Sequence, residues 1–239
     1  MPEHNGQYFI NNPIFVKYKT RFDFLRLKKV RHLKSVVLNE RIIEIPYAIR
    51  CVSALPMGKM VLDLGCTEST LSLNLAGLGY KVVGIDFRPY PYIHPNLRVL
   101  QGNILQLPLR NESFDAVLSI STIEHMGIGF YSDPQAGQHA DRQAMAEISR
   151  VLQPGGLAVL TVPYGVGSVN AHHRVYDQRT LDELLNSFEV AEIRYFASSR
   201  EARSRANFWS EVSSQQAARI ESPDTANCVC LVQAFRRGA

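Results

Sequence analysis

Short apolar strands alternate with helical segments from Met57 onward, and this alternation leaves few folds open to the chain. The strands are rich in valine, isoleucine and leucine and are apolar at consecutive positions. Such a pattern is typical of parallel strands that helices cover on both faces. The expected strands span residues 60–64, 81–86, 97–102, 114–120 and 156–162. The alternation predicts an α/β fold with a doubly wound, mostly parallel sheet, whose ligands bind beyond the carboxyl ends of the strands.

Three segments of this region have the signals of helices. Residues 68–77 place leucines on one face and end in glycine, and residues 138–152 repeat apolar positions at helical spacing before a Pro-Gly-Gly stop. Thr180 and Glu183 have the spacing of a capping box for a helix that runs through Phe188.

Residues 1–56 lack strand alternation and are expected to form an N-terminal helical extension or cap before a domain at residues 57–239. Between Lys17 and Lys34 this extension carries eight basic residues and one acidic residue, Asp23. The basic segment could attract phosphate, an acidic partner or anionic lipid headgroups. Charge runs usually serve solubility, however, and a solvated helix face is the favoured interpretation.

Composition argues against several classes of protein. Apolar residues make up 46% of the chain and charged residues 20%, which suits a globular domain with a real core. No apolar run approaches the roughly 18 residues of a membrane span, and the first residues lack the pattern of a signal peptide. The cysteines do not form a zinc-binding set, and we expect them to be reduced and mostly buried. A net charge of +4 does not by itself suggest nucleic acid, which is not expected as a partner, and a cytoplasmic location is expected.

The stretch VLDLGCTEST, residues 61–70, ends the first strand with a carboxylate and a glycine. In a doubly wound sheet, Asp63, Gly65 and Cys66 lie beside a helix N-terminus, whose N–H groups suit an anionic group. A dinucleotide-binding loop would need two more glycines, where Thr67 and Thr70 stand here. Asp63 would repel a pyrophosphate but attract an ammonium group. The loop therefore favours a zwitterionic amino-acid ligand, although a tight turn with no binding role would have a similar sequence.

Further polar side chains follow the next two strands. Asp86 ends the second strand, and a carboxylate there can accept hydrogen bonds from both ribose hydroxyls. Phe87 could stack on a base, and Asn103 could accept a hydrogen bond from its exocyclic amine. The residues suited to an ammonium group, a ribose and a base thus follow one another in this order along the chain. Each residue alone could be an ordinary cap or turn residue; the ordered set favours a bound nucleoside that carries an amino acid.

Four segments resemble the successive motifs of class I S-adenosylmethionine-dependent methyltransferases. They read VLDLGCTEST, VVGIDFRP, GNILQLPLRNESFDAVLSISTIEH and VLQPGGLAVLTVP, and the resemblance covers residues 57 to about 200. It implies a Rossmann-like sheet of seven strands with an antiparallel C-terminal hairpin, for which residues 189–197 and 228–235 are the candidates. It also implies S-adenosyl-L-methionine as cofactor. The cofactor-binding residues that follow from it are Asp63, Gly65, Cys66, Asp86, Phe87, Asn103, Ile104, Ser119 and Ser121.

The region after the fourth strand bears on which atom receives the methyl group. It reads SISTIEH, whereas methylation of base amino groups typically uses an Asn/Asp-Pro-Pro-Tyr/Phe stretch there. Cytosine C5 chemistry needs a thiolate near the substrate, but Cys66 lies in the cofactor loop. A hydroxyl acceptor gains most from a general base, and His125 lies just beyond this strand. His125 could instead pack beside the cofactor; His173 and Asp141 are the other catalytic candidates.

Two polar loops, residues 127–148 and 162–181, resemble segments of bacterial methyltransferases that modify sugars, polysaccharides or glycosylated natural products. The resemblance implies a small-molecule or saccharide acceptor. Its candidate ligands in these loops and in a possible lid at residues 200–216 are Tyr131, His139, His172, Arg174 and Trp209. Some sugar methyltransferases also hold Mg²⁺, for which Asp133, His139 and Asp141 are candidate ligands.

The sequence thus favours a methyltransferase that acts on the hydroxyl of a sugar or another hydroxylated metabolite. A methyltransferase for another small metabolite or for nucleic acid, a nicotinamide-dependent oxidoreductase and a non-catalytic binding module remain alternatives. A homodimer is also open, because residues 1–56 could either close the acceptor pocket or form a dimer contact.

Overall fold

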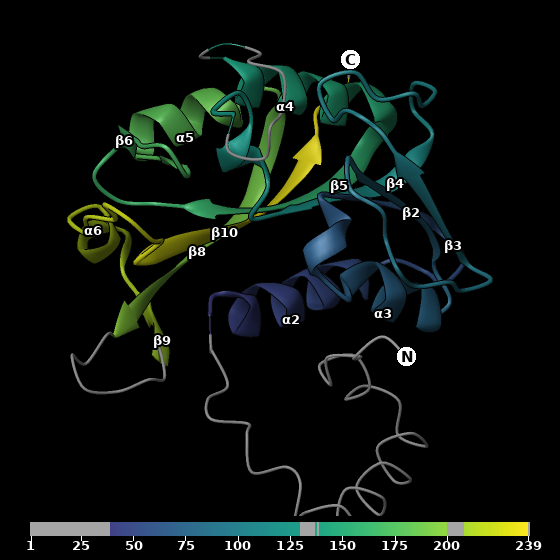
Figure 1. Cartoon of the computed structure of the whole chain (residues 1–239), viewed down its shortest axis with the longest axis horizontal. Coiled ribbons are helices and arrows are strands. Elements are labelled where there is room, and N and C mark those ends of the chain that lie inside the picture. Colours follow the sequence, from purple (N-terminus) through teal and green to yellow (C-terminus); the bar gives the residue numbers. More distant parts are fainter. Residues whose placement is uncertain (1–38, 130–136, 138, 200–207, 239) are drawn as a thin grey trace, which may run out of the picture.

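The computed structural model describes residues 39–129, 137, 139–199 and 208–238 (Figure 1). Tyr131, Asp133 and the basic segment between Lys17 and Lys34 lie outside the described residues, so the predictions made for them stay predictions.

A single large sheet of eight strands organises the described chain, in the order β3-β2-β1-β4-β5-β10-β8-β9. The five strands from β3 to β5 are parallel, and β10, β8 and β9 are antiparallel to their neighbours. This arrangement confirms the predicted doubly wound sheet with antiparallel C-terminal strands. The strands are β1 (Met60–Leu64), β2 (Lys81–Asp86), β3 (Leu97–Gln101), β4 (Phe114–Ile120), β5 (Leu152–Pro163), β8 (Phe188–Ser199), β9 (Phe208–Val212) and β10 (Cys228–Arg236). A separate hairpin consists of β6 (Ser168–Val169) and β7 (Arg174–Val175).

Helices cover both faces of the sheet, α2 and α3 on one side and α4 and α5 on the other (Figure 1). They are α2 (Arg41–Val52), α3 (Leu71–Gly77), α4 (Ala140–Val151), α5 (Gln178–Leu184) and the single turn α6 (Ser214–Ala217), with 3₁₀ turns η2 (Cys66–Glu68) and η3 (Ile123–His125). Among the described helices, none is long and apolar enough to cross a membrane.

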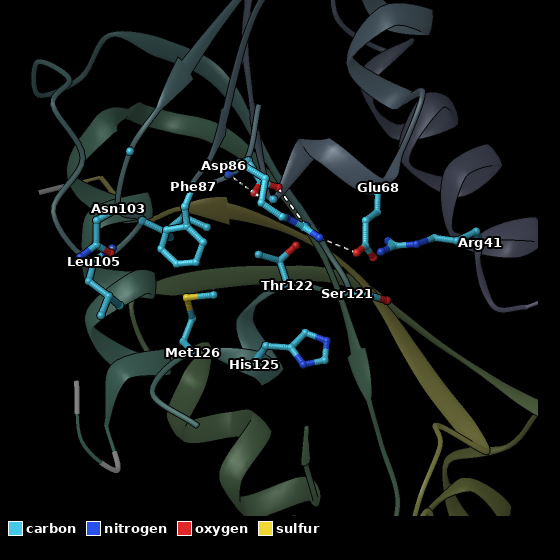
Figure 2. Close-up of a pocket in the computed structure, with 14 residues that line it drawn as sticks. Arg41, Glu68, Asp86, Phe87, Asn103, Leu105, Ser121, Thr122, His125 and Met126 are labelled. Carbon is cyan, nitrogen blue, oxygen red and sulfur yellow. Dashed lines mark hydrogen bonds and ion pairs between the residues drawn. The ribbon is translucent and has the colours of Figure 1, made fainter. Parts of the chain in front are cut away.

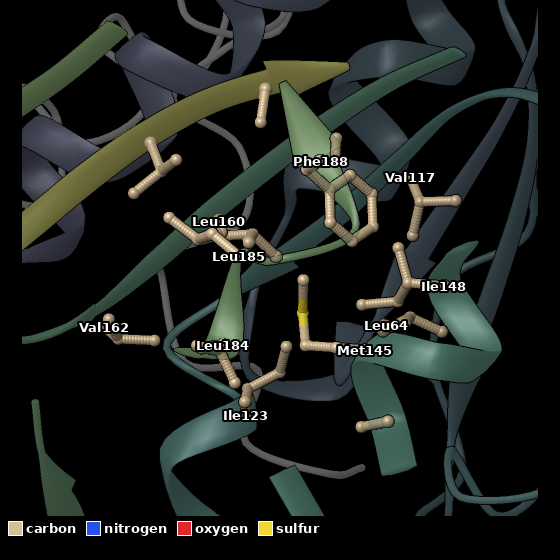
Figure 3. Close-up of a cluster of buried hydrophobic side chains, with 14 of the residues drawn as sticks. Leu64, Val117, Ile123, Met145, Ile148, Leu160, Val162, Leu184, Leu185 and Phe188 are labelled. Atoms are coloured by element: carbon tan, nitrogen blue, oxygen red, sulfur yellow. The ribbon is translucent and has the colours of Figure 1, made fainter. Parts of the chain in front are cut away.

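Each helical layer closes its own apolar core. Met145 and Ile148 of α4 and Leu184 of α5 pack against the sheet side chains Leu64 and Val117 (Figure 3). On the opposite face, α2 and α3 pack in a second cluster that includes Ala48, Val52 and Leu75. Successive apolar side chains of β1 and β4 therefore pack into the two cores on opposite faces of the sheet. This is why these strands do not alternate polar and apolar residues. All four cysteines are buried and free, as predicted.

The structure corrects two predictions about the C-terminal half. The sheet has eight strands instead of seven, because residues 208–212, within the segment predicted as a possible lid, pair with residues 195–199 of β8. The N-cap of α5 is Asp177, not Thr180: the Asp177 side chain accepts from Thr180 N–H at 2.8 Å, and Thr180 Oγ1 accepts from Asp177 N–H at 2.9 Å. Thr180 thus occupies the N3 position, and its hydroxyl accepts the hydrogen bond from the N-cap N–H that a Glu or Gln side chain usually accepts in a capping box.

Replacement of Asp177 by alanine should lower the free energy of unfolding by about 1 kcal/mol, because Thr180 N–H loses its acceptor. Asp182→Ala is the matched control on the same helix and should change stability by less than about 0.5 kcal/mol, since its carboxylate accepts only at the surface, from Gln178. Urea unfolding measures both.

The Asp177 effect should also depend on pH. The hydrogen bond from Thr180 N–H holds the pKa of Asp177 below its usual value. A depressed folded pKa contributes stability above the unfolded pKa of about 3.9, and this stability is lost as the pH falls through the folded value. The difference in the free energy of unfolding between wild type and Asp177→Ala should therefore become smaller below about pH 4. If Asp177→Ala destabilised the protein no more than Asp182→Ala at pH 7, the capping role of Asp177 would be contradicted.

Candidate active site

A pocket opens at the carboxyl ends of β1, β2 and β4, where the fold predicts ligand binding (Figure 2). Its empty space amounts to about 620 Å³, a volume that includes space open to solvent. Seven residues predicted from the sequence line it: Gly65, Asp86, Phe87, Asn103, Ile104, Ser121 and His125. The sequence analysis missed Arg41, Glu68, Arg88, Gly102, Leu105, Thr122 and Met126, which complete the lining.

The loop after β1 turns at Gly65, whose φ of 73° lies in the left-handed region. A Cβ atom at this position would lie 2.4 Å from Thr122 Oγ1, so glycine is required by space as well as by backbone conformation. Thr122 is itself held in place, because its hydroxyl donates to the carbonyls of Leu64 and Ile120. The predicted helix at residues 68–77 is interrupted: η2 ends at Glu68 and α3 begins at Leu71, with Ser69 in extended conformation between them.

Asp86, at the end of β2, is only 4% exposed and is the most heavily hydrogen-bonded carboxylate of the pocket. Its oxygens accept from the backbone N–H groups of Thr67 and Arg88, each at 3.0 Å, and from the Arg88 guanidinium. Arg88 also donates to Glu68 Oε1 at 2.6 Å. Burial raises the pKa of Asp86, but the hydrogen bonds from Arg88 and Thr67 outweigh it, so the pKa lies below its usual value. Asp86 is therefore ionised at neutral pH.

Asp63, at the end of β1, is not among the residues that line the pocket. It is 2% exposed, and its Oδ2 accepts from the Ser72 hydroxyl at 2.6 Å. Burial raises the pKa of Asp63 to about 6, against the opposing effect of Ser72 and of the nearby Arg41 charge. Cys66 and Ser119 are likewise buried outside the lining. The cofactor roles predicted for these three residues stay predictions.

Helix α2 brings two charged residues from the expected N-terminal extension to the site. Arg41 lines the pocket and donates to the carbonyl of Ile120 at 2.8 Å. Glu44 is fully buried and accepts from the Ser121 hydroxyl at 2.7 Å. Burial raises the pKa of Glu44, although Arg41 and Ser121 act in the opposite direction. Ser121 has a φ of 44°, so this contact holds a strained residue at the end of β4.

One wall of the pocket suits a flat apolar group. The Phe87 ring lies between Asn103 and Met126 in the close-up (Figure 2), and Ile104 and Leu105 are largely buried beside them. Asn103 Oδ1 accepts from Leu105 N–H at 2.9 Å, which fills one of the two acceptor positions of that oxygen. The second position and the amide N–H groups are the means by which Asn103 can address a base edge.

His125 follows β4 in η3 and lines the same pocket. Its Nδ1 lies 2.6 Å from the carbonyl oxygen of His172, and its Nε2 lies 3.8 Å from Oε1 of Glu124. Burial lowers the pKa of His125, so the imidazole is neutral at pH 7. Burial likewise raises the pKa of Glu124 well above its usual value. A neutral histidine and the ionised Asp86 therefore line the same pocket.

Four of the remaining candidates lie in two other places. His139, Asp141 and Arg174 line a second, polar cavity formed by the starts of α4 and α5 and the β6–β7 hairpin. Trp209 is in β9 at the far edge of the sheet, paired with Ser198.

The first of these groups is held by hydrogen bonds and one ion pair. Asp141 accepts from the Tyr176 hydroxyl at 3.0 Å and lies 3.8 Å from Arg174 Nε. His173 is buried, and burial lowers its pKa. Among the described residues there is no group of three His, Cys, Asp or Glu side chains that could hold a metal ion.

Residues 62–160 match the family described as a methyltransferase domain. A "Probable S-adenosylmethionine-dependent methyltransferase" from Mycolicibacterium smegmatis is 28% identical over 141 residues, which is 57% of this chain and 47% of that protein. A ubiquinone biosynthesis O-methyltransferase from Cereibacter sphaeroides is 32% identical over 111 residues, or 43% of this chain and 40% of that protein. The chain thus spans about half the length, or less, of these curated relatives.

Solved structures show the same fold. The 1,6-didemethyltoxoflavin-N1-methyltransferase of Burkholderia thailandensis, with bound S-adenosylhomocysteine, superposes with a TM-score of 0.57 at 16% identity, over 93% of this chain and 88% of that one. The [4+2]-cyclase SpnF gives a TM-score of 0.59 at 15% identity, over 86% of each chain. Residues 62–160 are therefore similar to a methyltransferase domain, and the described chain has the Rossmann-like fold of solved methyltransferases, as its motifs predicted. SpnF's name shows that the fold also accompanies another reaction, so the activity has to be argued from the site.

Gly65→Ala should lower the free energy of unfolding by at least about 2 kcal/mol, through the left-handed backbone and the clash with Thr122 together. Gly58→Ala is the control. Gly58 also has a positive φ, 85°, but an added Cβ would meet open space, so this variant should lose only about 1 kcal/mol, which is what the left-handed backbone costs. Urea unfolding compares the two variants, and equal losses would contradict the role of Thr122.

Proposed function

We propose that this protein transfers the methyl group of S-adenosyl-L-methionine to a hydroxyl of a small, hydroxyl-rich acceptor, a sugar or a glycosylated metabolite, with His125 as general base. One observation carries the proposal: a carboxylate at the tip of β2, an apolar wall and a neutral histidine line the same pocket at the carboxyl edge of the sheet. The carboxylate and the apolar wall suit a nucleoside, and the neutral histidine suits a nucleophile that has to lose a proton.

The donor set fits the proposed cofactor from end to end. Asp86 would hold the ribose hydroxyls, and Phe87 with Ile104 and Leu105 would enclose the adenine. At the other end, Arg41 offers a guanidinium to the carboxylate of the amino-acid part, and the nearby Asp63 stays the predicted partner of its ammonium. When bound, the cofactor supplies an electrophilic methyl group on a sulfonium sulfur.

His125 is suited to remove a proton from a hydroxyl. A carbonyl oxygen can only accept, so the 2.6 Å contact with His172 assigns the imidazole proton to Nδ1. Nε2 is then the basic nitrogen, and the lowered pKa keeps it unprotonated at neutral pH. Nε2 of His125 would take the proton of the acceptor hydroxyl during methyl transfer, which would remove the positive charge that otherwise develops on that oxygen.

The second cavity supports a hydrophilic acceptor. Its lining includes the charged side chains of Asp141 and Arg174. Arg174 Nη1 donates to the carbonyl of Met126 at 3.1 Å, and Met126 lines the first pocket, so the two cavities share a wall. A saccharide is rich in the hydroxyl groups that such side chains bind.

The choice of oxygen as the methylated atom rests on His125 and not on the comparisons. The curated relatives include an O-methyltransferase of ubiquinone biosynthesis and a lysine methyltransferase of the mouse, whose acceptor atoms differ. A deprotonating histidine favours the hydroxyl, because an alcohol is a weak nucleophile without a base.

The cofactor assignment predicts that S-adenosylhomocysteine binds the wild-type protein and binds Asp86→Ala at least about tenfold more weakly, through loss of charge-assisted hydrogen bonds to the ribose. Isothermal titration measures this, with the exposed Asp224→Ala as the control that should bind like the wild type. Absence of binding to the folded wild-type protein would contradict the proposal. A fluorescence titration that shows binding of NADH instead would favour the oxidoreductase alternative.

The base assignment predicts that His125→Ala lowers turnover by about 100-fold or more while affinity for S-adenosylhomocysteine changes little. Release of S-adenosylhomocysteine over a panel of sugars and hydroxylated metabolites measures turnover, and His94→Ala in the β2–β3 loop is the control. Because burial lowers the pKa of His125, wild-type turnover should stay level at neutral pH and fall as the pH drops below the usual histidine value of about 6.5. Full activity of His125→Ala would remove this residue as the base; binding of the cofactor without turnover of any acceptor would favour a binding module.

A further inference from the structure

The carboxylate of Asp86 is fully engaged by the protein itself. Oδ1 accepts from the backbone N–H of Arg88 at 3.0 Å and from its Nε at 3.2 Å, and Oδ2 accepts from Thr67 N–H at 3.0 Å and from Arg88 Nη2 at 3.4 Å. The dashed lines in Figure 2 mark contacts of this group. An ionised carboxylate offers about four acceptor positions, so these four bonds fill its capacity.

The four hydrogen bonds to Asp86 differ in how much of the protein has to move to break them. The two backbone donors belong to the turn after β2 and to η2, and moving them would mean rebuilding the loops that carry the site. The other two donors, Nε and Nη2 of Arg88, leave together when one side chain rotates. The ribose of a nucleoside presents two hydroxyl donors. The number of positions that the guanidinium can vacate equals the number that the ribose needs.

We infer that the Arg88 guanidinium and the ribose diol of the cofactor compete for the same two acceptor positions of Asp86, so that Arg88 sets the affinity of the site for its cofactor. This inference rests on the proposed function, since it needs a ribose at Asp86. It adds a residue that opposes binding to a site whose other residues favour it.

A second partner makes the displacement of Arg88 feasible. Arg88 Nη1 donates to Glu68 Oε1 at 2.6 Å, and the side chains of Arg88 and Glu68 are 38% and 51% exposed. Because this pair lies at the surface of the pocket, the guanidinium can leave Asp86 and still remain paired with Glu68 in a solvated position. The apparent affinity then equals the intrinsic affinity reduced by the fraction of molecules in which Arg88 has released Asp86.

Isothermal titration of the full chain with S-adenosylhomocysteine tests the competition. Arg88→Met keeps the length and the apolar stem of the side chain but removes the guanidinium, and it should bind about three- to tenfold more tightly than the wild type, since a partly exposed ion pair is worth little more than that. Arg98→Met makes the same change on an exposed arginine of β3 and should leave the affinity unchanged. Arg88→Lys retains the charge but lacks the paired donors, and its affinity should fall between those of wild type and Arg88→Met.

A second pair of probes separates competition at the ribose from a general effect of charge. The gain in Arg88→Met should appear for adenosine and be absent for 2′,3′-dideoxyadenosine, each measured by displacement of S-adenosylhomocysteine. Equal gains for both nucleosides, or weaker binding of S-adenosylhomocysteine by both Arg88 variants, would overturn the inference while the cofactor assignment stands. Failure of all the folded proteins to bind S-adenosylhomocysteine would instead overturn the proposed function, and the inference with it.

Discussion

Parallel pairing of β1 between β2 and β4 is the constraint from which the site follows. In this register Asp63 lies opposite Gly84 on one side and Leu118 on the other, and Leu64 lies opposite Ile85 and Ser119. Because the three strands run in the same direction, each delivers the loop at its carboxyl end to the same edge of the sheet. Residues separated by about sixty positions in the chain therefore line one pocket. The pairing is held by burial, since the side chains of β1 on both faces are covered by helices.

Helix α2 connects the predicted N-terminal extension to the candidate active site. Burial of Ala48 and Val52 against the sheet fixes the helix, and this places Glu44 under the hydroxyl of Ser121 and Arg41 on the pocket wall. A carboxylate buried without partners would be costly, so the contacts of Glu44 with Ser121 and Arg41 are part of what makes this packing tolerable. The backbone strain at Ser121 and the burial of Glu44 are thus coupled features of one contact between α2 and the end of β4.

Electrostatics at the pocket are set by how each acid is partnered. Asp86 is nearly buried yet strongly ionised, because Arg88 and two backbone N–H groups point at it. Asp63 is buried with a hydroxyl as its hydrogen-bond partner, and its pKa rises to about 6. Two acids at neighbouring strand ends consequently differ in their pKa, because burial dominates at Asp63 whereas the hydrogen bonds from Arg88 and Thr67 outweigh burial at Asp86. The same principle makes Arg88 both the group that keeps Asp86 charged and, under the proposed function, the group that the ribose would displace.

Local sequence determined the parallel strands, the turn at Gly65 and the order in which Asp86, Asn103 and His125 reach the site, because strand periodicity, glycine geometry and strand-end position are properties of neighbouring residues. The capping partner of α5 and the eighth strand were misjudged, since Thr180 could serve as either cap or N3 residue and residues 208–212 form a strand only because β8 offers them an open edge. Arg41, Glu44 and Arg88 carried no signal of their own in the sequence, where they stand among ordinary surface charges. Only the tertiary structure decided their roles, because a charged side chain acquires its function from the partners and the burial that distant segments impose on it.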